Sequence, residues 1–120
     1  MAGPRKGATG FLRLVNAARY SLDGLRAALS EEAFRQELLL AAILIPVGLF
    51  LGATAVERAL LVGSVLLVLI VELLNSAVEA TVDRVSLDDH SLAKRAKDIG
   101  SAAVMLSFVS LATVWLVVLL

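Results

Sequence analysis

Three runs without a charged residue, two long and a shorter one between them, restrict what this chain of 120 residues can fold into. They read LLLAAILIPVGLFLGATAV at 38–56, ALLVGSVLLVLI at 59–70 and AAVMLSFVSLATVWLVVLL at 102–120. A helix needs about 20 mainly apolar residues to cross a hydrocarbon core about 30 Å thick. Because 59% of all residues are hydrophobic as well, we predict one all-α membrane domain rather than a soluble protein.

The predicted layout places an interfacial helix before three spans. Apolar residues follow one face of a helix through residues 10–30, and the opposite face is basic, a pattern typical of helices that lie in the membrane interface. Trp115 near the end of the last run is expected to act as an interfacial anchor. The predicted segments are a mobile tail at 1–9, the interfacial helix at 10–30, and spans at 36–56, 58–85 and 92–120.

The distribution of basic residues predicts the orientation. Six of them precede the first span, four lie between Arg84 and Lys97, and Arg58 alone lies in the short loop after the first span. Positive residues favour the cytoplasmic side, so we expect a cytoplasmic N-terminus and an outside C-terminus. The first 30 residues lack the apolar core and cleavage site of a signal peptide, so none is expected.

Composition excludes several kinds of function. The formal net charge is zero, which does not suggest a nucleic acid partner. The chain has no cysteine, so disulfides and thiolate chemistry are excluded, and its single histidine argues against a histidine-built zinc site.

The stretch VELLNSAVEATVDR at 71–84 continues the second apolar run but carries four polar groups. Glu72, Asn75, Glu79 and Asp83 are spaced by three, four and four, which places them on one face of a helix. A carboxylate at depth in the membrane costs about 2.5–3.5 kcal/mol, so a functional role is the default hypothesis there. The alternative is interhelical hydrogen bonding alone, which we favour for Asp83 next to Arg84.

Repulsion between the acids would be relieved by a cation or a proton. Carboxylate oxygens without sulfur suit Mg²⁺, which nucleotide phosphates often carry. A second acidic pair, Glu31 and Glu32, lies on the same predicted side, as do Lys97 and Asp98. The pattern fits phosphoryl transfer to a membrane substrate, and it equally fits a proton relay.

The stretch VELLNSAVEATVDR, together with AKDIGSAAV at 96–104, closely resembles the signature of the small prokaryotic diacylglycerol kinases. EAFRQE at 32–37 and TGFLRLVNAARYSLDGLRAA at 9–28 resemble the same family, so the likeness covers nearly the whole chain. It implies a homotrimeric bundle in the bacterial inner membrane, with active sites shared between subunits. It also implies ATP-dependent phosphorylation of diacylglycerol to phosphatidic acid at the cytoplasmic face.

The resemblance also implies roles for single residues. Glu72 is similar to the general base, with Asn75 supporting it or the phosphates, and Glu31 and Glu79 are similar to the ligands of the Mg²⁺ that accompanies ATP. Residues similar to nucleotide-binding positions are Arg13, Tyr20, Glu31, Glu79, Asp88, His90, Lys97 and Asp98. Residues similar to lipid-binding positions are Ser21, Phe34, Arg35, Gln36 and Ser101.

Three alternatives stay open at this point. Glu32 competes with Glu31 for the metal role, although alignment on AFRQE favours Glu31. A sister branch of the family phosphorylates undecaprenol, and we rank this substrate second. A non-enzymatic, proton-coupled membrane oligomer that uses Glu72 and Glu79 as a relay is the more distant alternative.

Overall fold

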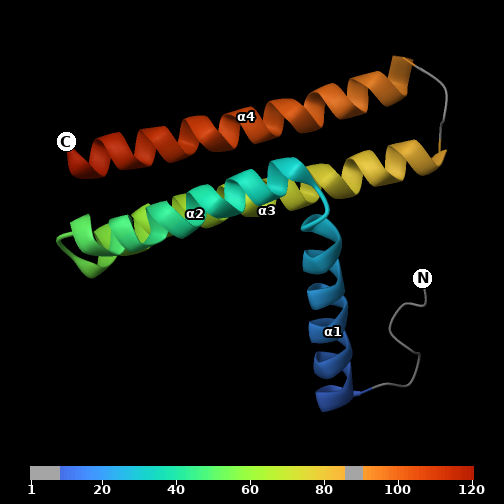
Figure 1. The fold of residues 1–120 in the computed structure, drawn as a ribbon, viewed down its shortest axis with the longest axis horizontal. Coiled ribbons are helices and arrows are strands. Elements are labelled where there is room, and N and C mark those ends of the chain that lie inside the picture. The colour runs from blue at the N-terminus through green and yellow to red at the C-terminus, as the bar shows by residue number, and fades with distance from the viewer. Residues whose placement is uncertain (1–8, 86–90) are drawn as a thin grey trace. The chain divides into compact units, whose positions relative to one another are not determined.

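The computed structural model describes residues 9–85 and 91–120, and these are helical except at short turns and ends. Four helices follow in order, as Figure 1 shows: α1 (Gly10–Ala28), α2 (Glu32–Leu51), α3 (Ala55–Val85) and α4 (Ser91–Leu119). The last three are long and apolar enough to cross a membrane. The prediction of an all-α chain with three such helices is therefore confirmed. Residues 1–8 of the predicted tail at 1–9 and the loop residues Asp88 and His90 lie outside the described residues.

The chain divides into two compact units, Met1–Glu32 and Ala33–Leu120. The described part of the first unit consists of α1 and the turn that follows it. Backbone N–H groups of Ser30 and Glu31 donate to the carbonyls of Ala27 and Ala28, at 3.2 and 2.9 Å, and these bonds end the helix before position 30.

The second unit begins with α2, which ends at Leu51 instead of the predicted 56. A new helix start explains the difference. Thr54 Oγ1 accepts a hydrogen bond from the Glu57 N–H at 3.1 Å, and the Glu57 carboxylate accepts one from the Ala53 N–H at 3.2 Å. This reciprocal pairing resembles a capping box. The uncharged residues that follow Leu51 therefore belong to a turn and to the first residues of α3.

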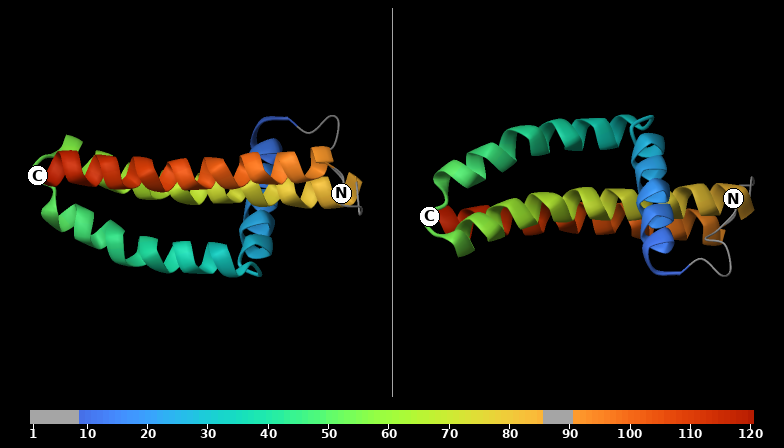
Figure 2. Two further views of the ribbon diagram at one scale, coloured as in Figure 1. Left: turned by 90° about the horizontal axis from the view of Figure 1, so that it is seen from above. Right: turned by 90° about the horizontal axis from the view of Figure 1, so that it is seen from below.

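Within the second unit, α3 and α4 run antiparallel and pack along their length (Figures 1 and 2). Helix α2 joins them through a small apolar core made by Ala41, Val65, Val68 and Leu111. Many other large apolar side chains of these helices stay exposed in the single chain. Such surfaces suit lipid or other protein, in agreement with membrane-spanning helices.

At the far end of the unit, Trp115 of α4 is held by α3. Its indole N–H lies 3.2 Å from both the Leu61 carbonyl oxygen and the Ser64 Oγ. Helix α2 approaches through Gly48, where an added Cβ would lie 3.1 Å from the Leu61 Cβ and 3.4 Å from the indole ring. Trp115, expected at the interface as an anchor, therefore has a hydrogen-bonded position between helices.

Candidate active site on the polar face of α3

The polar face of α3 changes from buried to exposed along the helix. Glu72 is only 5% exposed, Asn75 is half-buried, and Glu79 and Asp83 are exposed. The helix places all four on one side because their spacing follows its turns. The face thus leads from a buried carboxyl in the apolar half of α3 to exposed carboxylates near its end.

Glu37 of α2 meets Glu72 inside the second unit. The two carboxyl groups interact through a side-chain hydrogen bond, while Oε1 of Glu37 is buried and has no partner. A hydrogen bond between two carboxyls requires a proton, because an ionised carboxylate only accepts. The half-buried Glu37 and the buried Glu72 therefore form an acid pair that can share a proton.

Sequence reasoning did not single out Glu37, although a signal was present. Glu37 directly precedes the uncharged run 38–56, so it enters the first span about three turns ahead of the centre of that run. Its counterpart Glu72 interrupts the second span in a similar way. Acids at the same depth in neighbouring antiparallel helices are placed to meet.

Asn75 links the buried part of this face to the exposed part. Its Nδ2 donates to Oε1 of Glu79 at 3.4 Å, one turn further along α3. Its Oδ1 is buried without a hydrogen-bond partner. The amide thus contacts one carboxylate oxygen of Glu79 from the buried side of the face.

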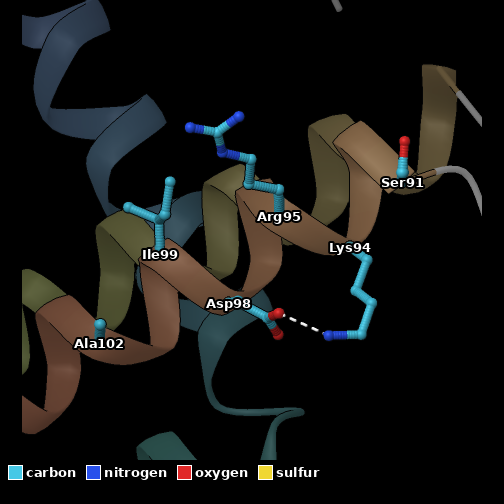
Figure 3. A pocket seen from close by; sticks show the side chains of 6 residues that line it. All are labelled: Ser91, Lys94, Arg95, Asp98, Ile99 and Ala102. Carbon is cyan, nitrogen blue, oxygen red and sulfur yellow. Dashed lines mark hydrogen bonds and ion pairs between the residues drawn. The ribbon is translucent and has the colours of Figure 1, made fainter.

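Two ion pairs bring α4 to the same end of the site. Lys97 Nζ lies 2.6 Å from Asp83 Oδ1 across the helices, and Lys94 Nζ lies 2.7 Å from Asp98 Oδ2 within α4. Figure 3 shows the second pair beside a shallow, open hollow of about 500 Å³. The residues that line it are Ser91, Lys94, Arg95, Asp98, Ile99 and Ala102. The structure therefore groups Lys97 with the α3 face and gives Asp83 the structural partner expected of it.

The other predicted site residues of the second unit differ in how exposed they are. Phe34 is buried, at 3% exposure, whereas Arg35, Gln36 and Ser101 are exposed. Their role at a lipid site stays a prediction.

The remaining predicted residues lie in the first unit. Arg13 and Tyr20 are seven residues apart on α1, which places them on the same side of that helix. Ser21 donates its hydroxyl to the Ala17 carbonyl at 2.9 Å, and Glu31 lies in the turn after α1. Their meeting with Glu79 and Lys97 stays a prediction.

A metal site can be judged only in part from these residues. Within 9–85 and 91–120, no group of three or more acids or histidines lies close enough to hold an ion. Glu79 nevertheless fits Mg²⁺, because this ion is commonly held by one or two carboxylates together with substrate phosphates. Glu31 or Glu32 would have to supply the second carboxylate.

Comparison with known proteins decides the family. The family described as prokaryotic diacylglycerol kinase matches residues 19–119. The chain belongs to this family of membrane kinases. A diacylglycerol kinase of Pseudomonas aeruginosa is 53% identical over 118 residues, which cover 98% of this chain and 96% of that protein.

More distant members of the family agree. A diacylglycerol kinase of Escherichia coli K12 is 47% identical over 112 residues, which cover 92% of each chain. Another, of Helicobacter pylori, is 40% identical over 109 residues, covering 90% of this chain and 85% of that protein. The suspected family resemblance is thus confirmed over all three long apolar helices and most of α1.

Proposed function

We propose that this protein is a lipid kinase that transfers the γ-phosphoryl group of ATP to diacylglycerol and forms phosphatidic acid and ADP. The observation that carries the proposal is the buried Glu72, paired with Glu37 at depth in an apolar helix of a diacylglycerol kinase family member. An acid placed in this way is costly to bury and is suited to proton transfer.

Glu72 acts as the general base. Its carboxylate accepts the proton of the primary hydroxyl of diacylglycerol while the hydroxyl oxygen bonds to the γ-phosphorus. The bond from that phosphorus to the β,γ-bridging oxygen breaks in line, and ADP leaves. Positioning and charge neutralisation supply most of the acceleration in such a reaction. Glu37 keeps Glu72 facing the interior of the unit until substrate arrives.

The polar groups at the exposed end of the face bind the nucleotide. Glu79 and Glu31, which lies in the turn after α1, would hold Mg²⁺, and the ion would supply charge neutralisation for the phosphates of ATP. Lys97 offers a cation to the phosphates, and Asn75 keeps Glu79 oriented. Arg13, Tyr20 and Asp98 complete the nucleotide site.

The surroundings of this reaction are the inner membrane of a bacterium. The distribution of basic residues supports a cytoplasmic nucleotide end, and the exposure of Phe11 and Leu14, at 81% and 70%, supports an interfacial α1 that turns them toward lipid. Three copies form the enzyme. The many apolar side chains that α2–α4 leave exposed supply surface for contacts between copies, and the acids gain shielding from them.

A substrate assay tests the proposal. Purified protein in detergent micelles receives ATP, Mg²⁺ and either a short-chain diacylglycerol or undecaprenol, and labelled lipid phosphate is measured. We expect phosphatidic acid as the main product. Faster formation of undecaprenyl phosphate would assign the chain to the other substrate, and absence of both products would favour a non-enzymatic oligomer.

A further inference from the structure

The side-chain amide of Asn75 has only one orientation that agrees with its hydrogen-bonding neighbour. A carboxylate oxygen of Glu79 lies 3.4 Å away and only accepts hydrogen bonds, so the amide nitrogen must face it. The amide oxygen is then turned the other way, where it is buried and has no hydrogen-bond partner. An unpaired, buried acceptor of this kind needs a physical explanation.

Gly100 of α4 lies opposite that oxygen. A Cβ added at Gly100 would overlap Oδ1 of Asn75 and would lie 3.2 Å from its Cγ. The Asn75 amide therefore occupies the space that a side chain at position 100 would fill. A Cα–H of Gly100 points along the same direction, so it can make the weak C–H···O contact that helix interfaces use.

We propose that Gly100 is a positioning residue, which holds the Asn75 amide between α4 and Glu79. Only glycine leaves room for Oδ1 of Asn75 against the backbone of α4. With the oxygen in this position, Nδ2 stays directed at Glu79. Any side chain at position 100 forces the amide to rotate, because the amide is the movable partner. Gly100 thus acts on the ion and nucleotide end of the site without touching either.

Gly100→Ala is the first variant. This inference rests on the proposed function for its kinetic readout. We expect the variant to fold, since Asn75 can turn away and alanine favours a helix. Loss of the Asn75–Glu79 contact should lower kcat at least tenfold and raise the Mg²⁺ concentration for half-maximal activity. Unchanged kcat and Mg²⁺ dependence would overturn the proposal.

Two other glycines provide matched controls. Nothing lies within 4 Å of a Cβ added at Gly63 of α3, so Gly63→Ala should leave both kcat and Mg²⁺ dependence unchanged. At Gly48 the added Cβ meets Leu61 and Trp115, so Gly48→Ala should lower the unfolding temperature but not shift the Mg²⁺ dependence. If Gly48→Ala shifted that dependence as Gly100→Ala does, general loosening of the helices would explain both.

A double variant shows whether Gly100 acts through Asn75. Asn75→Ala removes the amide, so adding Gly100→Ala should cause no further loss of kcat and no further Mg²⁺ shift. Additive losses would contradict the proposal. If Gly100→Ala alone does not fold, the double variant should fold again, because the amide that collides with the alanine is gone. A double variant that also fails to fold would overturn the proposal.

A readout without catalysis separates this inference from the proposed function. The side-chain amide signal of Asn75, identified by its loss in Asn75→Ala, can be followed by nuclear magnetic resonance in micelles. Gly100→Ala should shift this signal and Gly63→Ala should not. A shift in a protein without kinase activity would support the positioning and refute the function, whereas an unmoved signal refutes the positioning.

Discussion

Lys97 of α4 meets Asp83 of α3, with 2.6 Å between the Lys97 Nζ and the Asp83 Oδ1. The side chains keep 41% and 61% exposure, so water weakens the attraction. Lys97 is also the cation that we assign to the phosphates of ATP. If Lys97 binds the phosphates as proposed, Asp83 competes with the nucleotide for it.

The first prediction concerns Asp83→Asn. An exposed ion pair contributes about 0.2–1 kcal/mol, which corresponds to a change of roughly 1.4- to 5-fold in an equilibrium constant. We expect the KM for ATP to fall by a factor in this range, because Lys97 no longer has to leave a carboxylate. The free energy of unfolding should change by less than about 1 kcal/mol. Steady-state kinetics at saturating Mg²⁺ measure the first quantity.

Asp23→Asn is a control for this charge change. It removes the same charge from another exposed pair, in which Asp23 Oδ1 lies 3.8 Å from Arg26 Nη1 within α1. Its KM for ATP should equal that of the wild type. A higher KM in Asp83→Asn would mean that Asp83 orients Lys97 for ATP instead of competing for it.

The second prediction concerns Glu37. In Glu37→Gln the new amide can donate to the Glu72 carboxylate, so Glu72 keeps a partner and stability should hold. The amide also weakens the base, so kcat should fall by about tenfold, part of the 10²–10⁴ that a general base contributes. Glu37→Ala leaves buried Glu72 without a partner and should cost about 1–3 kcal/mol of stability as well. Wild-type kcat in both variants would remove Glu37 from the reaction.

The long helices were predictable from the sequence because a membrane leaves few choices. Uncharged runs must be helical there, since backbone groups have no water to bond. The ends were less predictable. The sequence does carry a helix-start signal at Thr54-x-x-Glu57, but the absence of charge through residue 56 extended the predicted span past it; the structure places the turn there through the side chains of Thr54 and Glu57. The approach of Gly52 adds to this, since an added Cβ would lie 3.0 Å from the backbone nitrogen of Arg58.

The site was predictable along one helix and not between helices. Spacing placed Glu72, Asn75 and Glu79 on one face, as the structure has them. Spacing says nothing about which residues of other helices lie opposite, so the pairing of Glu37 with Glu72 and of Gly100 with Asn75 required the packed structure. The residues that lie opposite them depend on how α2 and α4 are aligned lengthwise against α3. Contacts such as those at Trp115 set that alignment.

The third prediction concerns Glu72→Gln. The amide has nearly the same shape but cannot accept a proton, so kcat should fall by roughly 10²–10⁴. ATP binding should survive, because Glu72 is buried away from the exposed residues assigned to the nucleotide. Single-turnover kinetics and equilibrium binding of an ATP analogue measure the two effects. Near-normal turnover would remove Glu72 as the base.

The fourth prediction concerns the metal ligands. Glu79→Gln and Glu31→Gln each remove a negative oxygen ligand, so the Mg²⁺ concentration for half-maximal activity should rise at least tenfold in both, the effect of about 1.4 kcal/mol. Glu32→Gln is the matched control beside Glu31 and should keep the wild-type dependence. The reverse outcome for Glu31 and Glu32 would exchange their roles, and an unchanged dependence in Glu79→Gln would exclude Glu79.

The last prediction concerns Trp115→Phe. Phenylalanine keeps much of the ring surface against Gly48 but loses the indole N–H that bonds the Leu61 carbonyl and Ser64 Oγ. Hydrogen bonds between helices in membranes contribute about 0.6 kcal/mol on average and up to about 1.7 kcal/mol. We expect the free energy of unfolding in mixed micelles to fall by an amount in this range.

Kinetics distinguish this stabilising role from a catalytic one. Trp115 packs near Leu61, eleven residues before Glu72 on α3, or about 16 Å along the helix. The kcat and KM of Trp115→Phe should therefore match the wild type at temperatures where both proteins are folded. Ser64 provides a second measurement, because its hydroxyl donates to the Leu61 carbonyl at 2.8 Å and accepts from the indole. In a Ser64→Ala background, Trp115→Phe should lower the free energy of unfolding by less than it does in the wild type. An equal loss in both backgrounds would show that the two side chains do not act together.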